Sequence, residues 1–306
     1  AHYAKQGVNE DLALRTYTTR LLGGVPDLVQ HGGGNTSVKT QMPDPLGKPV
    51  DVLCVKGSGW DMAVIEPPGL PAVKLKPLQE LIALKSLTDE DMVNIQRCNL
   101  LDSTSPNPSV ETLFHAFLPH KFIDHTHASA VLAITDQPDG DAICRKLYGN
   151  RVALVDYEMP GFGLAKKAAA AFAANPQAQG LILLKHGIFT FAETAKEAYD
   201  LMSEVVTKAE RHLAKGKKTV FVPAKALPKK MAAAEDVLPI LRGLLALPVN
   251  DDGAFTRWVF NLRDSAEIQA FTRGKDVMRY SQAGTVTPHH VIRTKPRPLV
   301  LPAAGA

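Results

Sequence analysis

The sequence has few cysteines and no long apolar run. Only three of its 306 residues are cysteine, and no two of them are spaced as C-x-x-C. An odd, dispersed set of thiols argues against a disulfide framework and is typical of a reducing compartment. No stretch of 18 consecutive apolar residues occurs, so we predict neither a membrane span nor a membrane partner. The first 20 residues lack the apolar core of a signal peptide. These absences predict a cytoplasmic protein.

The sequence also has little net charge. Its 35 Lys and Arg residues against 31 Asp and Glu residues leave a net charge of +4, too small and too dispersed to indicate nucleic-acid binding. Hydrophobic residues make up 45% and charged residues 22%, which excludes a disordered or fibrous chain. No Walker A or Rossmann fingerprint is present, so we predict no nucleotide site. What remains is a globular protein with a sizeable core.

Residues 1–214 alternate strand-like apolar segments with helical patterns, which predicts a layered α/β domain. Asn107 and Pro108 suit the cap and first position of a helix that ends before Pro119. Beyond this domain we expect a basic linker to about residue 230, a mostly helical region over 231–275 and a proline-rich basic tail over 276–306. Other expected helices are 10–22, 76–85, 89–101, 164–174 and 193–213, and expected strands are 35–40, 50–55, 121–127, 151–156, 180–184 and 188–191.

Three of the ten histidines have a spacing that indicates a metal site. His125 and His127 lie on one expected strand, where side chains two residues apart share a face and have Cα atoms about 6.5 Å apart. His186 follows another expected strand and precedes Gly187, where the backbone can turn sharply. Three imidazoles with an open fourth position are typical of a catalytic zinc. A hydrogen-bonded core histidine is the alternative at each position.

Glu111 falls in the first turn of the expected helix that begins near Asn107. A carboxylate there is favoured by the helix dipole, so a surface role is one interpretation. The other is a general acid or base aimed at the metal, or a fourth ligand that substrate displaces.

Three short segments are candidates for anion binding. The glycines of residues 32–34 precede Asn35, and the loop Lys56-Gly57-Ser58-Gly59 combines two glycines with a cation. Ser109 falls at the start of the expected helix, where anions are favoured. Each segment alone is more often a simple turn.

These motifs, in this order, resemble the class II aldolase/adducin family over about residues 10–214. The loop 56–59 and the tail from Thr287 to Pro296 are most similar to the aldolase part of the rhamnulose-1-phosphate aldolase/alcohol dehydrogenase type. The nucleotide fingerprint of a dehydrogenase half is absent. The chain therefore looks like the aldolase portion alone, either a fragment or a shortened relative.

The resemblance implies a three-layer α/β/α sandwich around a mainly antiparallel central sheet. It implies a catalytic domain over residues 1–214, with residues 215–306 as linker, helical extension and tail, and a homotetramer whose subunits share sites. It also implies roles for residues that match the family's motifs. The implied metal ligands are His125, His127 and His186, which bind zinc or another divalent transition metal; the implied catalytic carboxylate is Glu111; and the implied phosphate-binding residues are Asn35, Ser58, Gly59 and Ser109.

Two residues extend this implied site. Val110 stands where some relatives have a second serine, and we infer that the charge of Lys56 compensates for the missing phosphate contact. Tyr157 lies in a segment resembling one that reaches a neighbouring subunit's site, where a phenol can transfer a proton at the aldehyde oxygen. A packed tyrosine is the alternative reading of Tyr157.

The implied activity is reversible cleavage of a ketose 1-phosphate, such as rhamnulose 1-phosphate, to dihydroxyacetone phosphate and a small aldehyde through a metal-stabilised enediolate. A decarboxylase or a sugar-phosphate epimerase on the same fold is an alternative. Related 4-epimerases carry Asp where this chain has Glu111, which favours aldol chemistry. A second alternative is a non-catalytic, adducin-like interaction domain, which would need no histidine triad.

The role of the C-terminal region stays open at this point. Residues 215–306 are a candidate docking region for a dehydrogenase. His289, His290 and Arg293 are instead candidates for folding back over the active site and touching substrate, and a surface tail is the plain alternative.

Overall fold

The structure is a computed structural model that describes residues 2–216, 221–225 and 232–301. The chain divides into two units. The first comprises Ala1–Gly216 together with Val286–Thr294, and the second comprises Lys217–Thr285 together with Lys295–Ala306. The larger part of the predicted basic linker lies outside the described residues.

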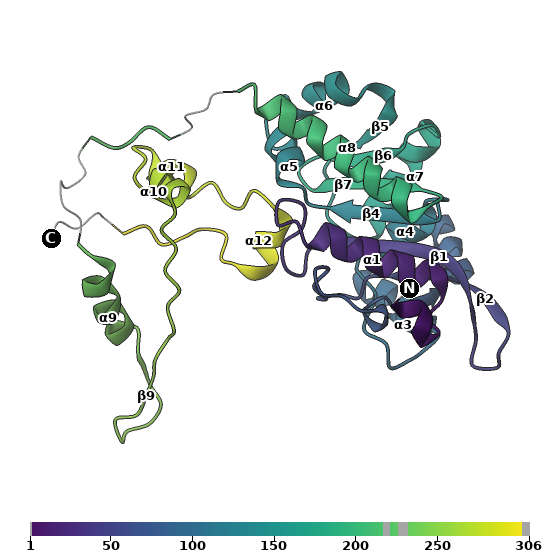
Figure 1. Ribbon diagram of the computed structural model, residues 1–306, viewed down its shortest axis with the longest axis horizontal. Coiled ribbons are helices and arrows are strands. Elements are labelled where there is room, and N and C mark those ends of the chain that lie inside the picture. The colour runs from purple at the N-terminus through teal and green to yellow at the C-terminus, as the bar shows by residue number, and fades with distance from the viewer. Residues whose placement is uncertain (1, 217–220, 226–231, 302–306) are drawn as a thin grey trace. The chain divides into compact units, whose positions relative to one another are not determined.

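A seven-stranded sheet forms the centre of the first unit, in the order β3-β2-β1-β4-β7-β6-β5 (Figure 1). All neighbouring strands are antiparallel except β5 and β6, which are parallel. Strand β4 therefore lies in the middle of the sheet, between β1 and β7. The strands are β1 (Asn35–Pro43), β2 (Pro49–Val55), β3 (Ala72–Lys74), β4 (Phe122–Thr126), β5 (Val152–Val155), β6 (Gly180–Leu183) and β7 (Gly187–Ala192).

Both faces of this sheet are covered by helices. On β2, Val52 and Cys54 pack on one side while Leu53 and Val55 pack on the other, because successive strand side chains point to opposite faces. Four helices cover one face of the sheet: α1 (Glu10–Gly23), α5 (Ser129–Thr135), α6 (Gly140–Tyr148) and α8 (Ala195–Leu213). Four others cover the opposite face: α2 (Leu75–Glu80), α3 (Asp89–Cys98), α4 (Thr112–Phe117) and α7 (Phe162–Ala174). The predicted three-layer α/β/α architecture is confirmed.

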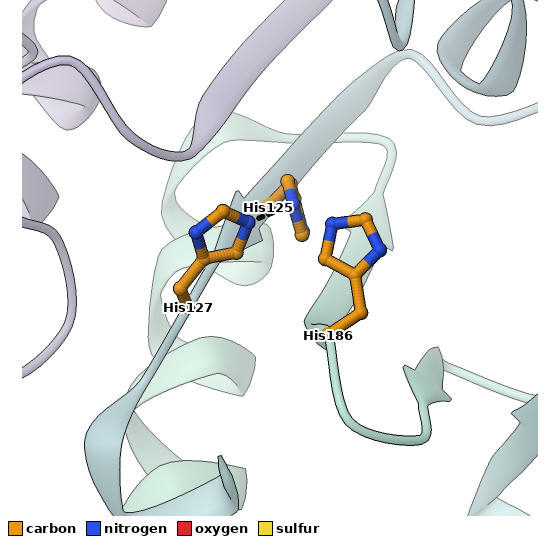
Figure 2. A group of neighbouring side chains, drawn as sticks. All are labelled: His125, His127 and His186. Carbon is orange, nitrogen blue, oxygen red and sulfur yellow. Dashed lines mark hydrogen bonds between the residues drawn. The ribbon is translucent and has the colours of Figure 1, made fainter. Parts of the chain in front are cut away.

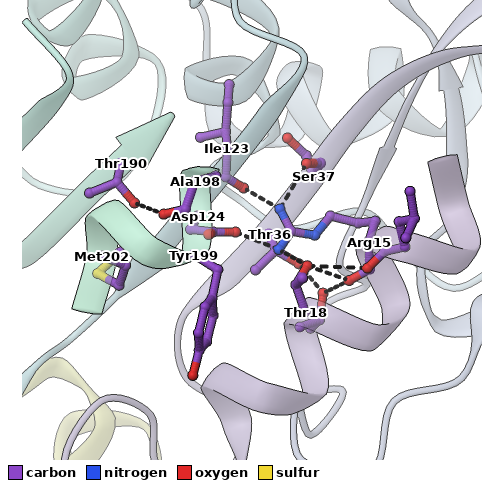
Figure 3. Close-up of polar contacts among 12 residues, drawn as sticks. Arg15, Thr18, Thr36, Ser37, Ile123, Asp124, Thr190, Ala198, Tyr199 and Met202 are labelled. Atoms are coloured by element: carbon purple, nitrogen blue, oxygen red, sulfur yellow. Dashed lines mark hydrogen bonds and ion pairs between the residues drawn. The ribbon is translucent and has the colours of Figure 1, made fainter. Parts of the chain in front are cut away.

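Helix α1 is anchored to the middle strand by a buried ion pair. Arg15 Nη2 lies 2.5 Å from Asp124 Oδ1 of β4, and both side chains are fully buried (Figure 3). Arg15 also donates to Thr18 Oγ1 at 2.6 Å. The helix begins where the sequence predicts, with Asn9 Oδ1 accepting from the Leu12 N–H at 3.2 Å.

One predicted helix start is wrong, and it bears on the site. Helix α4 begins at Thr112 rather than at Pro108. Pro108 instead forms a β-bridge with Gly57, and the Ser109 N–H donates to the Lys56 carbonyl at 3.1 Å. Strand-like pairing between two loops thus overrides the local capping pattern. Ser109 is not at a helix N-terminus, and Glu111 occupies the residue before the helix rather than its first turn.

The second unit is less helical than predicted. Helices α9 (Ala234–Leu244), α10 (Ala266–Thr272) and α11 (Val277–Tyr280) are present. Between α9 and α10 the chain forms a short hairpin of β8 (Leu247–Pro248) and β9 (Phe255–Thr256), where we had predicted mostly helix. Helix α12 (Pro288–Arg293) belongs to the first unit. Across the described parts of the chain, every helix is too short or too polar to cross a bilayer.

Candidate metal centre

The three histidines come from two segments that meet at one end of the central strands β4 and β7. His125 lies on β4, and His127 follows one residue after that strand ends. His186 lies in the tight connection between β6 and β7. Because β7 pairs with β4, this connection is held beside the end of β4.

Two local features allow that approach. Lys185 has a φ of 62°, so this residue, rather than Gly187, takes the left-handed conformation in the turn. Gly187 is needed for space, since a Cβ there would lie 2.5 Å from the Thr126 carbonyl oxygen and 3.1 Å from His125 Cε1. The predicted sharp turn at Gly187 is therefore wrong, and Gly187 has a packing role instead.

The three imidazoles converge. The Nε2 atoms of His125 and His127 lie 3.0 Å apart, and one nitrogen from each of the three rings lies within 4.8 Å of the others (Figure 2). All three side chains are buried. The geometry that the spacing of His125 and His127 predicts is therefore present, and His186 joins them.

The protonation of these rings suits metal binding. His125 Nδ1 donates to the Ile188 carbonyl at 3.0 Å, so Nε2 carries the lone pair that faces the centre. Burial lowers the pKa of His125 to about 4 and holds the pKa of His127 well below its ordinary value. At neutral pH both rings are uncharged, which is the form that ligates a metal.

Glu111 adds a buried negative charge to this cluster. Its Oε1 lies 3.2 Å from His186 Nε2, and its Oε2 lies 3.3 Å from His125 Nε2. Burial acts to raise the pKa of this carboxyl, but His125, His186 and His127 outweigh burial and hold the pKa well below its usual range. The carboxylate is therefore ionised at neutral pH.

This arrangement fits a divalent cation. The His125 lone pair faces a carboxylate oxygen, so two acceptors meet without a proton between them. Glu111 Oε1 has no hydrogen-bond partner among the described residues although it is buried. A buried carboxylate oxygen without a hydrogen-bond partner is costly unless a cation or a donor satisfies it. Three imidazole nitrogens plus a carboxylate form a donor set that suits zinc and similar transition metals.

The predicted anion-binding residues divide into a buried and an exposed group. Asn35 and Ser109 are buried beside Glu111, with Asn35 Nδ2 donating to Glu111 Oε2 at 2.7 Å and to Ser109 Oγ at 3.1 Å. Lys56 is also buried, and its Nζ lies 3.4 Å from the Gly32 carbonyl oxygen. Ser58 and Gly59 are on the exposed part of the same loop.

One residue of the site was missed in the sequence analysis. His115 donates from Nε2 to Asn35 Oδ1 at 2.5 Å and accepts at Nδ1 from Ser37 Oγ at 2.8 Å. This orients the Asn35 amide so that its NH₂ group points at Glu111. Burial holds the pKa of His115 well below its usual value, so the ring stays neutral. Its position four residues after Glu111, on the next helical turn, was the available signal.

Tyr157 is not brought to this centre within the chain. Its side chain is 53% exposed, and its hydroxyl lies 3.2 Å from Met159 Sδ. A role for Tyr157 at the site of another subunit stays a prediction.

Comparison with known proteins agrees with this architecture. Residues 15–213 match the model of the class II aldolase and adducin N-terminal domain, and residues 232–306 match that of the second domain of class II aldolases. The N-terminal class II aldolase domain of a conserved protein from Thermoplasma acidophilum is 39% identical, with a TM-score of 0.64, over 67% of this chain and 95% of that one. An aldolase II superfamily protein from Pseudomonas syringae shares the fold at 15% identity, with a TM-score of 0.50, over 78% of this chain and 95% of that one.

A longer curated relative also matches. The uncharacterized oxidoreductase YuxG of Bacillus subtilis is 33% identical over 291 residues, which is 93% of this chain and 41% of that protein. The chain thus spans about two fifths of the length of that relative. From the match over residues 15–213, the chain belongs to the class II aldolase and adducin family.

Proposed function

We propose that this chain is a metal-dependent aldolase that reversibly cleaves a ketose 1-phosphate to dihydroxyacetone phosphate and a small aldehyde. The observation that carries the proposal is the buried Glu111 carboxylate held against three converging imidazoles, with Asn35 and Ser109 beside it. This arrangement offers donor atoms for a cation and polar groups for an anionic substrate.

In this proposal His125, His127 and His186 hold the metal. A divalent cation bound there polarises the carbonyl and adjacent hydroxyl oxygens of a ketose, so that negative charge can develop next to the carbonyl. Glu111 is ionised and lies at the triad, so it can exchange a proton with the substrate carbon from which the aldehyde departs. Asn35 fixes the carboxylate through its 2.7 Å hydrogen bond.

The polar residues next to Glu111 orient the substrate. Lys56, Asn35 and Ser109 bind the phosphate in this proposal, with Ser58 and Gly59 contributing from the outer part of the loop. Holding the phosphate sets the position of the carbonyl relative to the triad and so removes orientational freedom from the reaction. Loss of a phosphate-binding group should therefore weaken binding more than it slows the bound substrate.

Two broader features belong to the same proposal. We infer a cytoplasmic homotetramer in which the exposed Tyr157 serves a neighbouring subunit's site. The exposed Met159 beside it, 67% accessible, would then be covered by that subunit. Light scattering tests this point, and a monomer would contradict it.

We also propose that the chain corresponds to the aldolase portion of a longer, two-activity protein, in line with the length and name of the Bacillus relative.

Metal analysis combined with an aldehyde assay tests the reaction. Protein of known metal content is given a panel of ketose 1-phosphates and the matching unphosphorylated ketoses. We expect aldehyde release from a phosphorylated ketose, its loss after chelation and its return on adding back zinc or another divalent transition metal. Full metal occupancy without aldehyde from any sugar would contradict the proposal, and an epimerised or decarboxylated product would support the alternative activities.

A further inference from the structure

His289 of the C-terminal segment lies within the first unit, directly against the histidine triad. This segment, Val286–Thr294, contains α12 and is part of that unit. The ring centroids of His289 and His127 are 4.3 Å apart. Only 3% of the His289 side chain is exposed.

The His289 ring also lies on the glycine-rich loop before β1. A Cβ placed on Gly33 would lie 1.6 Å from His289 Cδ2 and 2.1 Å from His289 Nε2. The ring therefore occupies space that exists only because residue 33 is glycine. Lys56 borders the same loop, with its Nζ 3.4 Å from the Gly32 carbonyl oxygen.

The burial of His289 is not explained by hydrophobic packing. On the same short helix Val291 is 68% exposed, so an apolar side chain faces outward while an imidazole is buried. This is the reverse of the distribution that burial of apolar surface favours. His289 Nε2 is buried and has no hydrogen-bond partner among the described residues, which costs free energy unless a ligand supplies one.

The neighbouring histidine has a different role. His290 Nδ1 lies 2.7 Å from Thr287 Oγ1, so its contact is local to the start of α12. The side chain of Arg293, the third candidate named from the sequence, lies outside the described residues. Of the three candidates, the geometry therefore singles out His289.

We propose that His289 is a substrate-binding residue of this site, whose Nε2 hydrogen-bonds an anionic oxygen of the ligand beside Lys56 and the Gly32–Gly34 loop. The segment 286–294 then closes the site over the triad. This inference rests on the proposed function, because it assigns to His289 a contact with the phosphate of the proposed substrate. It adds a residue from beyond the catalytic domain that the sequence analysis delimited.

Variants of the full chain test the contact. In His289→Gln we expect the Kd of inorganic phosphate, measured by calorimetry on metal-loaded protein, to rise about 10- to 100-fold, since a hydrogen bond to a charged group is lost or weakened. KM for the ketose phosphate should rise in parallel while kcat changes less. Val291→Ala, on the exposed side of the same helix, is the matched control and should leave both values unchanged.

Gly33→Ala supplies a second, independent test. Its methyl group would collide with the His289 ring, so this variant should weaken phosphate binding to the same extent and speed hydrogen exchange over residues 286–294. Combining Gly33→Ala with His289→Ala should cause no further loss, because both changes remove one contact. Unchanged exchange and phosphate affinity in Gly33→Ala would overturn the proposal.

The remaining outcomes are also decisive. Loss of bound metal from His289→Gln would make His289 a metal ligand and overturn its assignment to the substrate. Wild-type phosphate affinity in that variant would overturn it as well. If no sugar yields aldehyde but His289→Gln and Gly33→Ala both weaken phosphate binding, the aldolase proposal fails while the His289 contact stands.

Discussion

Asp124 and His125 are neighbours on β4, and their side chains leave the sheet on opposite faces. On the side of α1, Asp124 pairs with Arg15 at 2.5 Å (Figure 3). On the other side, His125 stacks on Phe189 with ring centroids 4.0 Å apart and faces Glu111. One face of the strand therefore buries an anion with a cation of this chain. The other buries an anion against two imidazoles, 3.3 Å and 3.2 Å away, whose nitrogens can also bind a metal.

The difference separates a structural use of buried charge from a functional one. The Arg15–Asp124 pair is balanced by residues of the chain, so it can hold α1 on the sheet without any ligand. Glu111 instead lies beside three imidazoles whose nitrogens converge, so the chain offers donor atoms there for an outside cation.

The largest effect is expected from removing an imidazole of the triad. His127→Ala should yield metal-poor protein and lower kcat/KM by at least about 1,000-fold, because the cation's stabilisation of developing charge is worth several kcal/mol. Elemental analysis and the aldehyde assay measure the two effects. His212→Ala, at the end of α8, is the control and should keep metal and activity. Full metal content in His127→Ala would remove His127 from the ligand set.

Glu111→Gln should separate metal binding from catalysis. We expect metal to be retained and turnover to fall about 100- to 10,000-fold, since a proton-transfer group is lost while the three imidazoles remain. The free energy of unfolding of the metal-free protein should fall at neutral pH, because the depressed pKa of Glu111 means that the folded chain favours its carboxylate. Glu66→Gln, at an exposed ion pair with Arg20, is the matched control. Turnover equal to wild type would exclude Glu111 from catalysis.

Substitutions on the opposite face of β4 should change the free energy of unfolding rather than the activity. Asp124→Leu leaves Arg15 buried without its partner, so we expect the free energy of unfolding to fall by about 3–5 kcal/mol. The double variant Arg15→Met with Asp124→Leu should recover most of this loss and keep its metal. Urea denaturation and elemental analysis measure both quantities. If the double variant lost its metal, the two faces of β4 would not be independent.

A pH-dependent effect is expected at Lys39 of β1, a half-buried cation that donates to the carbonyl groups of His115 at 2.9 Å and His120 at 2.7 Å. Burial lowers the pKa of Lys39 to about 7 from an ordinary value of 10.5. Between these values the unfolded chain holds a proton that the folded chain releases. The free energy of unfolding should therefore rise with pH from about 7 to 10, by at most about 1.4 kcal/mol per pH unit.

Lys39→Met removes this titration. Denaturation of wild type and variant at pH 6.5 and pH 9.5 should show wild type gaining stability relative to the variant at the higher pH. An equal difference at both pH values would mean that Lys39 stays charged in the folded protein.

Sequence patterns predicted most helices and strands of the first unit. They failed where contacts with a distant segment override the local helix signal. The start of α1 follows from Asn9, and the ends of β4 lie within one residue of the prediction. At Asn107 the local pattern was equally clear, yet its carbonyl accepts from the Ser58 N–H at 2.8 Å and its side chain accepts from Arg97. Those contacts hold the segment out of a helix. Helices α5 and α6 were not predicted at all.

The amino-acid sequence by itself determined the chemistry of the local histidine motif. Histidines two apart at the end of a strand can share one ion whatever surrounds them, because the pleat repeats every two residues. Only the tertiary structure decided which distant groups join them. Pairing of β7 with β4 brings His186, the Asn35 amide and His115 set the orientation of Glu111, and α12 brings His289. Such contacts depend on strand register and on space left by glycine, which no short stretch of sequence specifies.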